Sequence, residues 1–133
     1  MRLRQSEIAE KALECITTAS AQRDLFDEYG TRANSFPTMI LQSGLAQALG
    51  FLRAKSGDDS PLKKAYAQYY KDLVALVRVA MPALPPDGEA FYQEVLQAEL
   101  GDYRRISQIT LDSAVWLKRL YQGSPKPKNG GQH

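Results

Sequence analysis

The sequence predicts an all-α protein, a single compact bundle of about five helices with a disordered C-terminal tail. Apolar residues recur at spacings of three and four along most of the chain, which places them on one side of a helix. No stretch alternates apolar and polar residues convincingly, as a half-buried strand does. A chain of 133 residues, 44% of them hydrophobic, has the size and balance of one globular domain. We expect one helical domain over residues 1–122 and a flexible Gly/Pro/Lys tail over residues 123–133.

The first expected helix covers about residues 3–28. Ile8, Cys15 and Phe26 lie on its apolar side, and Gly30 is expected to end it because glycine enters the left-handed backbone region freely. In this reading three acidic residues oppose the dipole at the end of the helix, where a basic partner surface or solvent would compensate them: Asp24, Asp27 and Glu28.

The second expected helix runs from Ser35, as N-cap, to Lys55. Pro37 falls in its first turn, where proline sacrifices no hydrogen bond. Its body is apolar nearly all round, as expected of a helix at the centre of a bundle. Gly44 and Gly50 each cost about 1 kcal/mol relative to alanine inside a helix, so we expect close packing at both.

Three more helices complete the expected fold. The third covers about residues 61–81, and the fourth begins after Asp87 as N-cap. The fifth covers about residues 101–121, with Trp116 and Leu117 expected in the core. The third helix has a regular apolar stripe, predicted to be buried: Leu62, Tyr66, Tyr69, Leu73, Leu76 and Ala80.

Catalytic chemistry finds little support in the sequence. The one histidine is His133, at the end of the tail, so catalytic triads and histidine-containing zinc sites are not expected. Cys15 lies on an apolar stripe and is interpreted as a core residue rather than a nucleophile. Asp58 and Asp59 precede Ser60 and Pro61, which favours a helix start over a metal site. We therefore expect no enzyme activity, no catalytic or metal-binding residues and no cofactor.

Location follows from the same composition. A single cysteine excludes an intrachain disulfide. The first residues include arginines but no apolar run after them, so no signal peptide is expected. No apolar stretch is long enough to span a membrane. The expected location is the cytoplasm.

The net charge of +2 is unevenly distributed. Residues 87–102 contain five acidic and no basic residues, whereas residues 30–86 contain seven basic and three acidic ones. Lys64, Lys71 and Arg78 recur every seven residues, with Lys63 beside them, along roughly 21 Å of helix axis. We call these four residues the basic ridge, and we predict that they contact RNA phosphates without reading bases. The alternative is an ordinary solvated surface.

Two sequence blocks contain, in chain order, Tyr29-Gly30, Phe36-Pro37-Thr38-Met39-Ile40, Gly44-Leu45 and Leu49-Gly50-Phe51-Leu52, and then Tyr103, Arg105, Ser107, Leu111 and Trp116-Leu117-Lys118-Arg119. Together they resemble the small helical subunit family of type III-B CRISPR complexes, also called Cmr complexes. Neither block is a catalytic motif, and the specificity of the resemblance comes from their combination and order. It covers roughly residues 29–55 and 103–121. The sequence has Ser43 where the family often has asparagine, and Ser107 where it often has threonine.

The resemblance implies a non-catalytic subunit of an RNA-guided antiviral complex. Its copies would stack along the backbone subunits, beside the large subunit, and help enclose the CRISPR RNA and its target RNA. The family supplies no RNA-binding motif, so Lys63, Lys64, Lys71 and Arg78 rest on their spacing alone. The alternative function is a helical adaptor that binds only protein partners, with no direct RNA contact.

Overall fold

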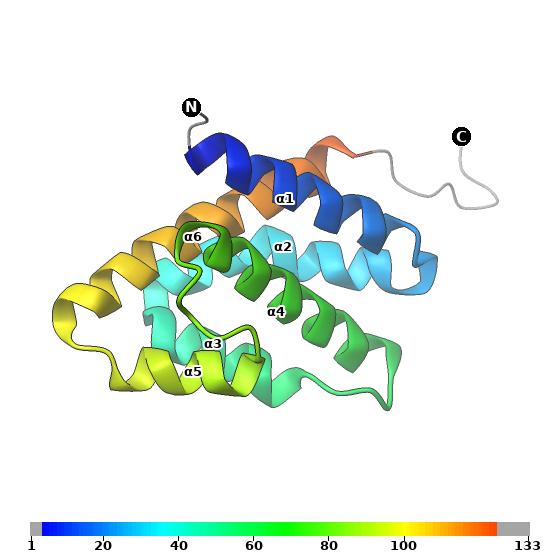
Figure 1. The fold of residues 1–133 in the computed structure, drawn as a ribbon. Helices are drawn as coiled ribbons and strands as arrows, with labels where there is room; N and C mark the ends of the chain where they lie inside the picture. Colours follow the sequence, from blue (N-terminus) through cyan, green and yellow to red (C-terminus); the bar gives the residue numbers. More distant parts are fainter. Residues whose placement is uncertain (1–3, 125–133) are drawn as a thin grey trace.

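The fold was obtained as a computed structural model, which describes residues 4–124 (Figure 1). Six α-helices occupy this range, and it contains no strand. The prediction of an all-α bundle is confirmed, with one helix more than expected. None of the helices within residues 4–124 is both long and apolar enough to cross a bilayer. The helices are α1 (Arg4–Ser20), α2 (Arg23–Ser43), α3 (Leu45–Lys55), α4 (Pro61–Ala80), α5 (Gly88–Gln97) and α6 (Leu100–Gly123).

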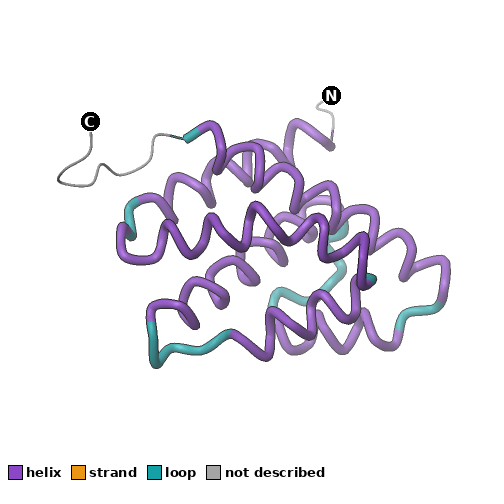
Figure 2. Tube along the Cα trace, turned by 180° about the vertical axis from the view of Figure 1, so that it is seen from behind, coloured by secondary structure: helices purple, strands orange, loops and turns teal. Residues whose placement is uncertain are grey.

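The core lies between two pairs of helices. Helices α1 and α2 each pack against both α4 and α6, while α5 packs on α3 and α4. Helices α1 and α5 therefore lie on opposite sides of the bundle, as seen from the front (Figure 1). From behind, loops are confined to short connections between the helices (Figure 2). Because α4 packs against α1, α2, α3, α5 and α6, one side of it is buried along most of its length.

The predicted end of the first helix at Gly30 is wrong. The helix ends earlier, at Ser20, and Ala21 and Gln22 connect it to α2. Gly30 lies buried inside α2. A Cβ added at Gly30 would lie 1.8 Å from Cζ of Tyr121, so the tyrosine ring occupies the space that a side chain would need. Glycine is required here for close packing of α6 on α2, not for a turn.

The predicted helix start at Ser35 is also wrong. Ser35 lies within α2 and donates a hydrogen bond from its hydroxyl to the carbonyl oxygen of Thr31. Pro37 is buried inside α2, which continues to Ser43. The break comes at Gly44, whose φ of 84° separates α2 from α3. The expected close packing holds at Gly50, where an added Cβ would lie 3.1 Å from the hydroxyl oxygen of Tyr92.

The later helices begin close to where the sequence predicts. The Ser60 side chain accepts a hydrogen bond from the Lys63 backbone N–H and caps α4, and Asp87 caps α5 through the Ala90 N–H. Leu62 was expected in the buried stripe but is 46% exposed, because the first turn of α4 extends past the core. Leu117 is fully buried as predicted.

Trp116 differs from the prediction of a core residue. It is only partly buried, packs against the edge of the core, and donates a hydrogen bond from Nε1 to Oε1 of Gln5 in α1. The predicted tail lies mostly outside the described residues. Its first two residues are described: Gly123 ends α6, and the Ser124 hydroxyl donates to the carbonyl oxygen of Tyr121.

Candidate nucleic-acid interface

The outward face of α4 presents two lysines of the basic ridge to solvent. Lys64 and Lys71 are exposed and lie two helical turns apart. Neither forms an ion pair within residues 4–124. The buried stripe of α4, from Tyr66 to Ala80, lies on its other side and fixes the helix orientation. Because packing against the core fixes the orientation of α4, both lysines are kept exposed to solvent.

Lys63 is exposed but already paired. Its Nζ lies 3.3 Å from Oδ2 of Asp59, one turn earlier, and both side chains are largely exposed. An exposed pair of this kind contributes about 0–1 kcal/mol, so it does not prevent the lysine from exchanging partners. The pair nevertheless reduces the net positive charge at the start of the ridge.

Arg78 is partly buried and stabilises a turn. Its Nε donates to the carbonyl oxygen of Leu84 at 2.6 Å, and Nη2 donates to that of Pro82 at 3.3 Å. These carbonyls belong to the chain that follows α4, where Met81 ends the helix. The guanidinium thus replaces the hydrogen bonds that the proline-rich turn cannot make with itself. Of the four ridge residues, only Lys64 and Lys71 make no described hydrogen bond or ion pair with their side chains.

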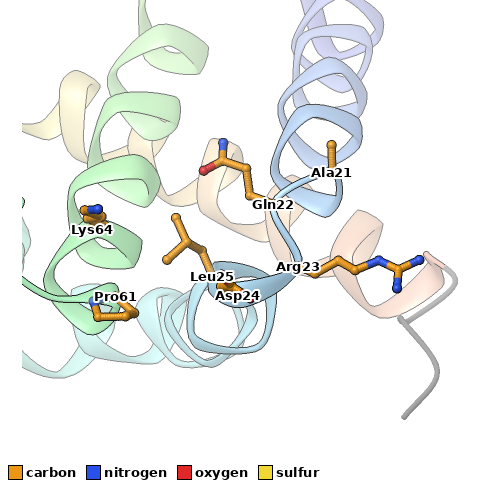
Figure 3. Close-up of a pocket in the computed structure, with 7 residues that line it drawn as sticks. All are labelled: Ala21, Gln22, Arg23, Asp24, Leu25, Pro61 and Lys64. Atoms are coloured by element: carbon orange, nitrogen blue, oxygen red, sulfur yellow. The ribbon is translucent and has the colours of Figure 1, made fainter. Parts of the chain in front are cut away.

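A hollow of about 540 Å³ adjoins Lys64. Figure 3 shows that it lies between the α1–α2 connection and the first turn of α4. Arg23 and Asp24 also line it, so it contains charges of both signs. Asp24 lies in the first turn of α2, where an acid is favoured by the helix dipole, and not at a helix end as predicted. The same correction applies to Asp27 and Glu28, which follow within α2.

The inner face of α4 contains a buried polar cluster that the sequence pattern did not predict. Asp72 is 7% exposed and accepts hydrogen bonds from the Tyr29 hydroxyl at 2.7 Å and from Nε2 of Gln68 at 2.8 Å. Burial raises the pKa of Asp72, although hydrogen bonds from Tyr29, Gln68 and Cys15 oppose the change. The signal available in the sequence was an aspartate directly before Leu73, on an otherwise apolar side of α4.

Cys15 lies against this cluster and is buried, as predicted. Burial first, and then the neighbouring Asp72 charge, raises the pKa of the thiol to about 12. The thiolate is the nucleophilic form of cysteine, so this environment favours an inert thiol at neutral pH. Within residues 4–124 no group of three histidine, cysteine or acidic residues is arranged to hold a metal ion.

Comparison with known proteins gives one consistent result. Residues 4–124 match the protein family described as CRISPR-associated protein (Cas_Cmr5). The "CRISPR system Cmr subunit Cmr5" of Thermus thermophilus is 31% identical over 122 residues, which are 92% of this chain and 96% of that protein. The crystal structure of a CRISPR-associated Cmr5 family protein from the same organism superposes with a TM-score of 0.78. That structure is 28% identical in sequence, and the match covers 92% of this chain and 97% of the other.

Proposed function

The chain belongs to the Cas_Cmr5 family, the small-subunit family of type III-B CRISPR effector complexes, and we propose that it works there as a non-catalytic RNA-holding subunit. Several copies would stack along the backbone of the complex, next to the large subunit. They would help hold the CRISPR RNA and its target RNA through phosphate contacts. Target cleavage and other chemistry would then belong to other subunits.

The observation that carries the RNA contact is the exposure of Lys64 and Lys71 on the outward face of α4. Phosphate binding needs mobile or exposed cations whose charge is not already neutralised, and both lysines meet this requirement. Lys63 contributes after exchanging Asp59 for a phosphate. Arg78 contributes positive potential from the last turn of α4, since its guanidinium is committed to carbonyl oxygens of the segment that follows.

Stacked copies make such a small site effective. A single subunit with two free lysines binds RNA weakly, with a nonspecific dissociation constant on the order of 10⁻⁴ M at physiological salt. When several copies face one RNA, the second and later contacts become intramolecular and the affinities multiply. The RNA contact is therefore expected in the assembled complex, and only weakly in the free protein.

The test is charge reversal at Lys64 and Lys71 in the reconstituted complex. We expect Lys64→Glu with Lys71→Glu to leave the fold unchanged and to lower target-RNA affinity for any guide sequence. The slope of log affinity against log salt is negative, and its magnitude should decrease by about 1.4 per incorporated copy, because two single-strand phosphate contacts are lost. Arg105→Glu with Arg119→Glu, two exposed arginines on α6, is the matched control for net charge.

Arg78 is kept unchanged in this test because its loss would disturb the turn after α4. If the double variant assembles and binds target RNA with the wild-type affinity and salt slope, direct contact is refuted. The protein is then an adaptor that binds only protein partners. If assembly itself fails while the control assembles, the outward face of α4 is a protein interface.

A further inference from the structure

The hollow beside Lys64 has walls of different chemical character. Leu25, in the first turn of α2, and Pro61, at the start of α4, give it apolar surface, and Gln22 lines it from the α1–α2 connection. In Figure 3 the side chains of Gln22 and Leu25 project toward α4, on which Lys64 lies. The side chain of Arg23 points away from α4 in the same view. The hollow therefore combines an amide, an apolar surface and a cation.

Gln22 has hydrogen-bonding capacity that the fold does not use. It is the N-cap of α2, but its side chain makes no capping hydrogen bond, and its amide has no described partner within residues 4–124. A glutamine amide offers two donors and one carbonyl acceptor. The residue is exposed, so water satisfies the amide in the free protein and another polar group can replace that water.

The size and the charge of the hollow fit a nucleobase better than a bare phosphate. Its volume of about 540 Å³ lies within the range of about 300–1,000 Å³ that is usual for sites of small organic molecules. Its lining residues carry charges of both signs, from Lys64 and Arg23 and from Asp24. The carboxylate repels a phosphate group, whereas a base is uncharged. A base also has a flat apolar face and an edge of donors and acceptors, which match the apolar walls and the amide.

Lys64 belongs both to the hollow and to the proposed RNA contact. Lys71 lies seven residues further along α4, about 10 Å along the helix axis. An RNA strand whose phosphates contact both lysines therefore passes the mouth of the hollow. The base of the nucleotide at Lys64 reaches the hollow when it leaves the stack of its neighbours. Leu25 and Pro61 then cover the face of the base that the stack had covered.

We propose that the hollow receives one unpaired base of the target RNA, from the nucleotide whose phosphate contacts Lys64. This inference rests on the RNA contact proposed above for Lys64 and Lys71. The base lies against Leu25 and Pro61, and the Gln22 amide forms hydrogen bonds to its edge. Because the amide is both donor and acceptor and every base has a flat face, the hollow accepts all four bases and does not distinguish sequence.

The first test measures target-RNA affinity of the reconstituted complex. Gln22→Ala with Leu25→Ser should lower it by about fivefold or more, because each incorporated copy loses its contact with a base. The slope of log affinity against log salt should stay unchanged, since uncharged side chains release no counterions. Leu13→Ser with Gln42→Ala makes the same two changes at exposed residues of α1 and α2, and this control should bind as the wild type does.

A photocrosslink locates the base directly. 4-Thiouridine replaces one nucleotide of the target RNA at a time, and mass spectrometry identifies the crosslinked residues. At one position or more the crosslink should fall on residues 21–25, and Gln22→Ala with Leu25→Ser should remove it. The CRISPR RNA substituted in the same way should give no crosslink there. Circular dichroism checks the fold, and Gln22→Ala alone, at an exposed side chain, keeps the test valid if Leu25→Ser unfolds the protein.

Four results would overturn the proposal. The first is wild-type affinity in the variant of Gln22 and Leu25, and the second is a smaller salt slope in that variant, which would mean that the hollow holds a phosphate. The third is a set of target-RNA crosslinks that all lie outside residues 21–25. The fourth is a variant that fails to assemble while its control assembles, which would make the hollow a protein interface.

Failure of this inference and failure of the RNA contact give different results. The affinity and salt slope of Lys64→Glu with Lys71→Glu test the contact by themselves, whatever the variants of the hollow do. If that charge variant is weakened while Gln22→Ala with Leu25→Ser binds normally, the phosphate contact stands and the base site is wrong. If the charge variant binds as the wild type does, both are wrong.

Discussion

Lys71 and Asp72 are neighbours in sequence but belong to two different regions of α4. Lys71 is exposed on the outward face, while Asp72 is 7% exposed and bonded to Tyr29 and Gln68. The inner face determines where the helix lies, and the outer face is free to carry charge. The buried residues of α4 thus fix its position, and its exposed residues supply the available charge.

The largest expected effect is on the inner face. Leu73→Ala removes a side chain that is 1% exposed, and it should lower the free energy of unfolding by about 2–5 kcal/mol through lost burial and a cavity. Urea unfolding followed by circular dichroism measures this. A loss below about 1 kcal/mol would mean that the core closes around the gap, and the two faces would differ less than described.

An intermediate effect is expected at Arg78, which is partly buried and lies between the inner and the outward face of α4. Arg78→Ala should lower the free energy of unfolding by about 1–2 kcal/mol, because two carbonyls of the turn lose a charged donor. Arg105→Ala, at an exposed arginine with no described contact, is the control. If both variants unfold at the same urea concentration, Arg78 belongs with the free cations and the ridge regains its predicted extent.

The pH dependence of stability should reveal the buried carboxyl group of Asp72. Because burial raises the pKa of Asp72 above its unfolded value, the folded state binds this proton more tightly. The stabilising contribution of this bound proton is fully present below the ordinary aspartate pKa of 3.8, and it is lost as pH rises through the raised pKa of folded Asp72. Relative to Asp72→Asn, the wild type should therefore become less stable as pH increases. Urea titrations of both proteins at several pH values test this, and a constant difference would contradict it.

The smallest effect is expected on the outward face. Lys71→Ala should change the free energy of unfolding by no more than about 0.5 kcal/mol, since the lysine forms no ion pair within residues 4–124. Thermal melting followed by circular dichroism is sufficient. A clear loss of stability would place Lys71 in the internal structure and weaken the case for an RNA contact.

Helix starts were predictable where a short polar side chain caps them. Ser60 and Asp87 carry that signal, and both caps are present. The boundaries of the first three helices were predicted wrongly because the sequence does not distinguish a glycine that packs inside a helix, such as Gly30, from one that ends a helix, such as Gly44. Gly30 makes room for the ring of Tyr121, far along the chain, and Gly44 turns the backbone. No local pattern separates these two roles, because one of them depends on a distant residue.

The candidate site was also predictable only in part. Seven-residue spacing correctly placed Lys64 and Lys71 on an exposed side of α4. The spacing contained no information on Asp59 or on the carbonyls of Pro82 and Leu84, which engage Lys63 and Arg78. Spacing reports the side of a helix that a residue occupies, while its partners depend on where other segments pass.

The packing of Tyr121 against Gly30 has a consequence for how the protein is made. Because a chain is synthesised from its N-terminus, Gly30 is made long before the Tyr121 ring that packs against it. Until then Phe26, whose ring centroid lies 4.9 Å from that of Tyr121, has one face without its partner. The synthesis of α6 thus completes a core to which α1 and α2 already contribute, and a message cut short just before codon 121 would yield a chain that cannot close this core.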